Sequence, residues 1–79
     1  MTMKVFLHTR TPQQRDWLNE ERKFGRIPVV GEFVATSASG SSWFKVELVV
    51  HTPFVCEFDA EVYAVEVDHL VVLNEALDR

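Results

Sequence analysis

The residues best suited to chemistry lie in one stretch, WFKVELVVHTPFVCEFDAEVYAVEVDHLVVL, from Trp43 to Leu73. It contains two histidines, one cysteine and six carboxylates. A cysteine nucleophile needs a nearby base and a thiolate, and His51 lies close to Cys56 across a threonine–proline turn. However, the carboxylates around Cys56 favour a neutral thiol, and no glycine-rich loop follows that could hold an oxyanion. We therefore predict no catalytic residue and expect Cys56 to be a small buried apolar side chain.

Histidines at metal-ligand spacing would support a second kind of chemistry. His8, His51 and His69 are 43 and 18 residues apart, and none has a second histidine two to four positions away. Zinc sites often draw ligands from such short spacings. We therefore predict no metal and no cofactor, and interpret the histidines as polar positions at strand ends. A small-ligand or metal site near His51 and Cys56 is kept as one alternative.

The carboxylates Glu57, Asp59 and Glu61 alternate along the chain, so a strand would place all three on one face. Paired carboxylates can hydrolyse glycosidic bonds, but that chemistry needs a deep cleft, which 79 residues hardly provide. A solvated strand face is the simpler interpretation, and an acidic strip that docks a basic protein is the functional one. Beside the serine-rich segment at 37–42, an aromatic anchor would complete that surface. The predicted partner-binding residues are Trp43, Glu57, Asp59 and Glu61.

Charge is divided unevenly along the chain. The net charge is −4, but residues 1–26 carry six basic and three acidic side chains, whereas residues 27–79 carry two basic and nine acidic ones. The acidic total argues against nucleic acid as a partner. A nucleic-acid-associated domain stays an alternative, and its basic stripe would consist of Arg15, Arg22, Lys23 and Arg26. Acidic neighbours interrupt this stripe, so a mixed solvated face is the simpler interpretation.

The first part of the chain predicts a strand followed by a helix. Residues 3–9 are β-prone and alternate, with His8 on the face opposite to Leu7. The segment TPQQ at 11–14 can begin a helix, because its threonine can cap the first turn, proline suits the first helical position and glutamine can complete a capping box. We expect this helix to run from about Pro12 to Lys23 and, because its apolar stripe is thin, to lie on the surface.

The remaining segments predict mainly strands. RIPVVGEFVATS, at 26–37, predicts an edge strand, because proline cannot donate within a sheet. A further strand from about Val55 to Val67 changes phase, so we expect a bulge or bend near Tyr63–Ala64. The tail favours a short strand at Leu70–Leu73 with a loose or helical end. The clearest strand covers 43–51 and places four apolar residues on one face: Phe44, Val46, Leu48 and Val50.

Length and composition fit one small globular domain. The 79 residues are 47% hydrophobic and 25% charged, which argues against disorder. A single cysteine cannot form an internal disulfide. The N-terminal MTMKVFLHTR lacks the apolar run of a signal peptide, and no segment reaches the roughly 20 apolar residues of a membrane span. We therefore expect a cytoplasmic protein that does not enter membranes.

Three strand-like motifs carry a resemblance to a known framework. They are I-P-x-V-G-E-F-V from Ile27, W-F-x-V-x-x-V-V-H-T-P-F from Trp43 and A-E-V-Y-A-V from Ala60. Together they resemble a small SH3-like β-barrel and are similar to uncharacterised short bacterial and phage proteins. The resemblance covers Ile27 to Val65. It implies a barrel of short strands, and it implies no activity.

Together these features predict an α+β, β-rich fold. We expect a small curved antiparallel sheet or SH3-like barrel of about five strands, with one capped helix at about Pro12–Lys23. A single domain should cover residues 1–79. The predicted function is a non-enzymatic interaction module that binds a protein partner, with a homodimer as one form of that interaction. Its binding surface would be acidic, β-structured and edged by aromatic residues.

Overall fold

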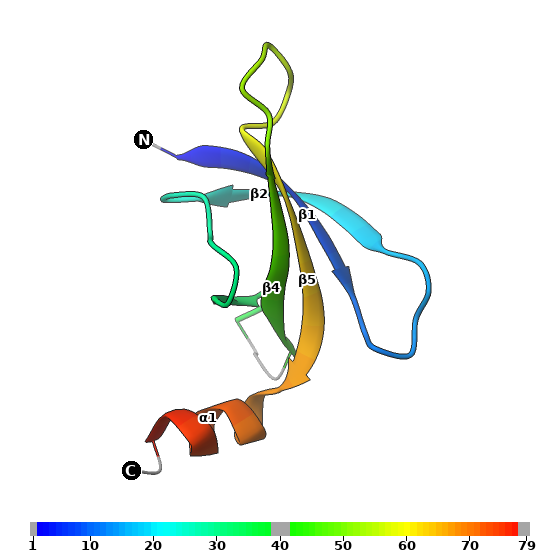
Figure 1. Cartoon of the computed structure of the whole chain (residues 1–79), viewed down its shortest axis with the longest axis vertical. Coiled ribbons are helices and arrows are strands. Elements are labelled where there is room, and N and C mark those ends of the chain that lie inside the picture. The colour runs from blue at the N-terminus through cyan, green and yellow to red at the C-terminus, as the bar shows by residue number, and fades with distance from the viewer. Residues whose placement is uncertain (1, 39–41, 78–79) are drawn as a thin grey trace.

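The computed structural model describes residues 2–38 and 42–77 and shows one five-stranded sheet followed by one helix (Figure 1). The strand order across the sheet is β2-β1-β5-β4-β3. The predicted small β-rich fold with about five strands is therefore confirmed. The elements are β1 (Met3–Arg10), β2 (Leu18–Phe24), β3 (Phe33–Ala35), β4 (Ser42–His51), β5 (Ala60–Asp68) and α1 (His69–Leu77).

The sheet is mixed, so the prediction of a purely antiparallel sheet is wrong. β1 and β5 pair in parallel at the centre, with His8 opposite Tyr63. The other three neighbouring pairs are antiparallel. A parallel pair requires a long crossover, and β2, β3, β4 and their connections provide it. Polarity patterns along a strand do not encode the direction of its neighbour, which is why the sequence did not reveal this pairing.

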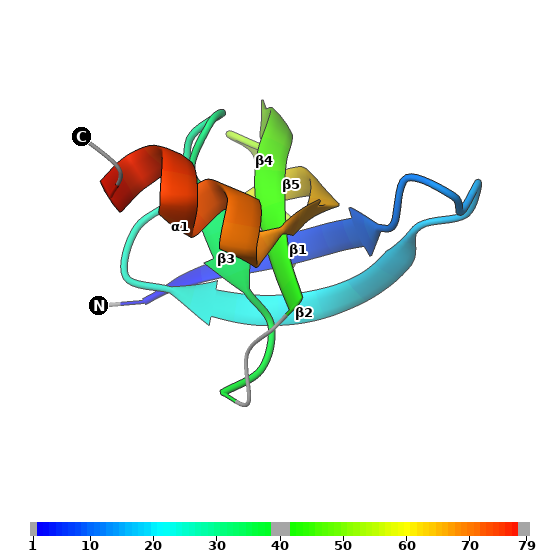
Figure 2. The same cartoon turned by 90° about the horizontal axis from the view of Figure 1, so that it is seen from below.

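The sheet curls so that the β1–β2 pair lies across the β4–β5 pair (Figures 1 and 2). The sheet ends at β2 on one side and at β3 on the other, which makes it an open half-barrel. Across the opening, the Arg22 guanidinium on β2 donates a 3.1 Å hydrogen bond to the Thr36 carbonyl just after β3. Side chains on the inner face of this curl form the core.

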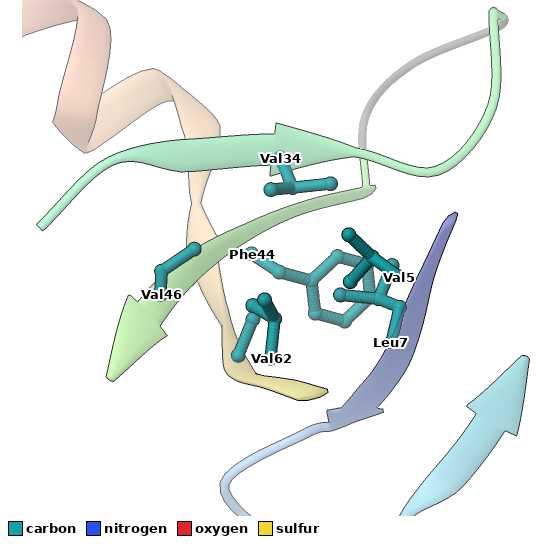
Figure 3. Packing of buried hydrophobic residues seen from close by; sticks show 7 residues of the cluster. Val5, Leu7, Val34, Phe44, Val46 and Val62 are labelled. Carbon is teal, nitrogen blue, oxygen red and sulfur yellow. The ribbon is translucent and has the colours of Figure 1, made fainter. Parts of the chain in front are cut away.

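The core is a compact aliphatic cluster with one aromatic ring (Figure 3). Val5 and Leu7 of β1 point toward Val46 of β4 and Val62 of β5, and all four are fully buried. Burying such side chains contributes about 1.5–3 kcal/mol each. The remaining members of the cluster are Val34, Phe44 and Ala64, with Phe24, Ile27 and Val49 packed against it.

The predicted helix over Pro12–Lys23 is wrong, because the chain forms a single turn there and then enters β2. The Gln14 side chain accepts a 3.0 Å hydrogen bond from the Thr11 amide, so the expected capping contact exists. The Gln14 amide donates to the Thr11 carbonyl at 3.1 Å, which closes a turn. From Leu18 onward the chain instead pairs with β1 over seven positions. This ladder outweighs a helical propensity that only a thin apolar stripe supported.

A β-bulge at Glu47 divides β4 into two halves of opposite phase. Val46 pairs with Ala64 and Leu48 pairs with Tyr63, so Glu47 is the extra residue. The predicted irregularity near Tyr63–Ala64 therefore exists, but the inserted residue lies on the facing strand. Because of the bulge, Leu48 faces away from the core, which corrects the prediction that one apolar face runs along the whole strand.

The last two elements differ from their predicted bounds. β5 begins at Ala60, and residues 52–59 form a connection, so the predicted long strand from Val55 is wrong at its start. The tail is helical rather than a strand at Leu70–Leu73, because Asp68 caps α1: its Oδ1 accepts from the Leu70 amide at 3.0 Å. Among the described residues, no helix has the length and apolar character needed to span a membrane.

Candidate functional site

The outer face of the sheet, opposite the core, carries a histidine that is almost completely enclosed. His8 of β1 is 6% exposed. Its Nδ1 lies 2.5 Å from Oδ1 of Asn19 on β2, and its Nε2 lies 3.0 Å from Oε1 of Glu61 on β5. Both neighbouring strands thus contribute a polar partner, which fixes the orientation of the ring. The alternation predicted for β1, with His8 opposite to Leu7, is confirmed.

Aromatic rings surround this histidine and form what we call the aromatic cluster: Phe6, His8, Trp17, Phe58 and Tyr63. His8 stacks on Tyr63 with ring centroids 4.3 Å apart and meets Phe6 edge-on at 4.5 Å. Tyr63 in turn contacts Trp17 at 5.3 Å in a T-shaped arrangement. Such pairs stabilise by about 0.5–1.5 kcal/mol beyond the area they bury. The cluster is therefore a second packed layer, on the opposite side of the sheet from the core.

Two connections close the ends of the aromatic cluster. The β1–β2 connection supplies Trp17, whose ring lies 4.8 Å from the Arg10 guanidinium. The β4–β5 connection supplies Phe58, which stacks on Phe6 at 4.6 Å. The hydroxyl of Thr52 donates to the Phe58 carbonyl at 2.7 Å and holds that connection in place. Both loops are thus anchored to the strands through side chains of the outer face.

The β4 side of the outer face is uncovered. Past the bulge, Leu48 and Val50 share the face of Tyr63 and Glu61, their partners on β5. Leu48 is 52% exposed and Val50 is 39% exposed. We call these two residues, together with the exposed Lys45 on the same face, the open patch. It adjoins the aromatic cluster directly through Tyr63.

The outer face is basic although the chain as a whole is acidic. Register places four cations on this face of the strands: Lys4, Arg10, Lys23 and Lys45. The carboxylates on the same face are Glu21 and Glu61, and the second of these contacts His8. Lys4 and Lys23 stand directly opposite each other, an arrangement of like charges that an acidic partner would relieve. The face therefore suits a negatively charged partner.

The structure does not bring the four sequence-predicted binding residues together. Trp43 lies at the α1 end of β4, with its ring 5.6 Å from His69. Glu57 and Asp59 lie in the β4–β5 connection, beyond His51 at the other end of that strand. His51 is eight positions along β4 from Trp43, which corresponds to a distance of about 26 Å. The segment at 39–41, which was to join this surface, lies outside the described residues.

The predicted acidic strip does not lie along one strand, and internal contacts use two of its members. Oδ2 of Asp59 accepts from the Lys4 amide at 2.8 Å, and the Asp59 amide donates to the Lys4 carbonyl at 2.7 Å. Asp59 thereby extends the pairing of β1 with the chain leading into β5. Glu61 is the His8 partner, whereas Glu57 is exposed in the loop. The structure thus gives Asp59 and Glu61 structural roles.

The remaining candidate sites are dispersed as well. Cys56 is exposed, not buried as predicted, and its Sγ lies 3.0 Å from the Phe58 carbonyl. His51 is exposed at the end of β4. Over residues 2–38 and 42–77, no group of three or more histidine, cysteine or acidic side chains could hold a metal ion. The geometry therefore assembles no ligand set around these two residues.

The predicted basic stripe is also divided. Arg15 lies in the β1–β2 connection, and Arg22 and Lys23, as neighbours on a strand, point to opposite faces. Arg22 contacts Glu20 at 3.0 Å. Arg26 binds Glu32 through its two terminal guanidinium nitrogens, with Nη1 2.8 Å from Oε1. No single surface presents the four side chains.

The Arg26–Glu32 pair organises the connection from β2 to β3. Hydrogen bonds from the Arg26 guanidinium and from the Val29 amide lower the pKa of Glu32 to about 2. The Glu32 amide donates to the Val29 carbonyl at 3.1 Å, and Gly31 adopts a φ of 96°, a left-handed conformation that glycine tolerates. Because of this turn, the Gly31 amide donates to the Val46 carbonyl on β4, and the Val46 amide donates to the Glu32 carbonyl. The contact is structural.

Sequence reasoning missed the aromatic cluster and the open patch. The cluster joins residues as far apart as His8 and Glu61, which only the parallel β1–β5 pair brings together. Alternation along β1 did place Phe6 and His8 on one face, and that was the available signal. The sequence indicated an irregularity near Tyr63–Ala64, but nothing within residues 43–51 indicated that Leu48 is exposed.

Comparison of the chain with protein-family models, with curated proteins and with solved structures gave no match.

Proposed function

We propose that this protein is a non-enzymatic interaction module that binds another protein through the open patch. The observation that carries this proposal is the half exposure of Leu48 and Val50 on the part of β4 that pairs with β5. Apolar side chains exposed together beside packed aromatic residues are typical of protein-binding surfaces. The partner surface that fits is an apolar patch bordered by carboxylates, because cations outnumber carboxylates on this face of the sheet.

The surroundings of the open patch favour binding without large rearrangement. Tyr63, which borders the patch, is held by His8 on one side and by Trp17 on another. A surface whose side chains are already ordered loses less conformational entropy when it binds. Lys45 lies within the patch and can attract acidic groups during the encounter. Affinity should therefore fall as ionic strength rises.

A selection experiment tests this proposal. Binders are selected from a random peptide library against the protein, and each is then titrated against the double variant Leu48→Ser, Val50→Thr. Val55→Thr is the control, because Val55 is a fully exposed valine that lies outside the patch, in the β4–β5 connection. We expect peptides rich in apolar and acidic residues that bind the control normally and the double variant at least about tenfold more weakly. Peptides that bind all three proteins equally would contradict the proposal.

A second candidate, binding of single-stranded nucleic acid, is favoured by one observation: cations and aromatic rings share the outer face. Stacking and phosphate contacts would then supply the affinity. The aromatic rings stack on one another, however, which leaves fewer ring faces for bases. Titration of a labelled oligothymidine at rising salt distinguishes the two candidates. Tight, salt-sensitive binding that Lys45→Ala weakens would favour nucleic acid over a protein partner.

Three earlier expectations accompany this proposal. The acidic surface around Glu57 stays an alternative contact region for a basic partner. The SH3-like resemblance and the cytoplasmic location also stay predictions.

A further inference from the structure

The C-terminal helix α1 exposes an apolar stripe. Leu70, Leu73 and Leu77 follow the spacing of one helix face, and Leu70 and Leu77 are 60% and 76% exposed. No residue of α1 is buried. A nine-residue helix is too short to be stable in isolation, so its formation depends on packing. Within the described chain its main contact is with the end of β5, from which it projects below the sheet (Figure 1).

A hollow of about 710 Å³ lies at the opening of the half-barrel, beside the edge strand β3. Its lining is mostly apolar and includes Phe24, Pro28, Val34 and Ala35, and the Arg26–Glu32 ion pair borders it. Next to it, Val29 and Val30 are 55% and 60% exposed. Apolar hollows of this size suit insertion of several aliphatic side chains. The same chain therefore carries both an uncovered apolar helix and an uncovered apolar recess.

Within one chain the helix does not cover the hollow. α1 starts at the residue after β5, and the Asp68 side chain fixes its first turn. β5 is the central strand of the sheet, whereas the hollow borders the edge strand β3. No linker separates α1 from β5, and no residue of α1 lines the hollow. A second copy of the chain, in contrast, supplies a helix for each hollow.

The exposed area fits one missing interface. The chain exposes 5713 Å², whereas a folded monomer of 9.1 kDa is expected to expose about 4,900 Å². The excess, about 800 Å², equals the area that each partner buries in a standard protein interface. The radius of gyration agrees: it is 13.2 Å, compared with about 12 Å for a compact chain of this length.

We infer that α1 of one copy packs its leucine stripe into the hollow beside β3 of a second copy, and that the reciprocal contact completes a two-fold dimer. Such an isologous arrangement closes after two subunits and leaves no free apolar stripe. It uses neither Leu48 nor Val50, so the open patch stays available to another protein. The inference is thus independent of the proposed function, and either can fail without the other.

Sedimentation equilibrium of the full chain over about 1–200 μM tests the inference, together with two interface variants. Leu77→Asp damages the helix, and Ala35→Arg fills the hollow. We expect the wild type to be dimeric and each variant to dimerise at least about tenfold more weakly. Leu48→Ser is the control, because Leu48 is a half-exposed leucine outside the interface. Circular dichroism establishes that each variant keeps its sheet.

Mixing the two variants provides the decisive measurement. In a reciprocal dimer, the Ala35→Arg chain still has an intact helix and the Leu77→Asp chain still has an intact hollow. A mixed dimer therefore regains one of its two contacts, and energy transfer between labelled chains should reveal it where neither variant alone associates. A monomeric wild type would overturn the inference. So would a dimer that Leu48→Ser disrupts, or one that Ala35→Arg leaves unchanged, since these results place the interface elsewhere.

Discussion

The bulge in β4 predicts that two strand leucines on opposite faces of the sheet contribute differently to stability. Leu7 is fully buried in the core, whereas Leu48 is 52% exposed on the outer face. Replacing a leucine by alanine removes three carbon atoms, each contributing about 0.8 kcal/mol when buried. For Leu7 this amounts to about 2.4 kcal/mol, and the cavity left behind raises the loss to roughly 3–4 kcal/mol. For Leu48, about half of this transfer free energy is lost and no enclosed cavity forms, so we expect a loss of stability of about 1 kcal/mol.

These losses are large compared with the stability of so small a chain. At about 0.05–0.15 kcal/mol per residue, the 79 residues are stabilised by roughly 4–12 kcal/mol. With a urea dependence of about 1 kcal/mol per molar, Leu7→Ala should lower the midpoint by about 3–4 M and Leu48→Ala by about 1 M. Urea titrations followed by circular dichroism measure both shifts. Equal losses, or a larger loss at Leu48, would refute the assignment of the two faces, because regular alternation without the bulge buries Leu48 in the core.

Two further predictions concern local features of the chain. Deleting Glu47 removes the extra residue, so Leu48 then follows Val46 in regular alternation and the later β4 side chains keep their faces; we expect the unfolding free energy in urea titrations to fall by less than about 1 kcal/mol. Deleting Lys45, in the regular half of β4, should instead turn part of the strand to the opposite face and lower the unfolding free energy by roughly 2–3 kcal/mol, and equal losses for the two deletions would contradict the bulge. The pKa of Glu32 is lowered from 4.5 to about 2, so the unfolded chain binds this proton at higher pH than the folded one. Thermal unfolding can be followed between about pH 6 and about pH 2. The wild type should lose stability below about pH 4.5, and Glu32→Gln should lose less over the same range. Equal losses of stability in the two proteins would count against the ion pair.

Much of the sheet could be predicted because strand formation depends on local alternation. β1 alternates between core and outer residues as expected, and the first half of β4 does so with Phe44 and Val46 inward. These positions follow from the two-residue period of a strand. The outer contacts of His8 could not be predicted in the same way, because Asn19 and Glu61 come from two other strands.

The failed helix shows how a correct local motif can mislead. The capping contact between Thr11 and Gln14 forms, but it closes one turn and not a helix. Capping contributes about 1 kcal/mol, whereas pairing with β1 aligns the whole of β2 with the centre of the sheet. The C-terminal helix was obscured for the opposite reason. Its valines favour a strand, and Asp68 acts as a cap only once β5 ends there.

The parallel β1–β5 pair also has a consequence for the way the protein is made. Val5 lies opposite Ala60, so the strand synthesised first waits for the partner synthesised last among the strands. At about 5–20 residues per second, the 55 residues between them take roughly 3–11 s to translate. Before β5 is made, the β1–β2 and β3–β4 pairs can form but neither can join the other, and the apolar side of Val5 and Leu7 stays uncovered. Nascent chains stalled before Ala60 should therefore be bound by chaperones and cut by proteases. Chains that include all of β5 should be bound and cut much less.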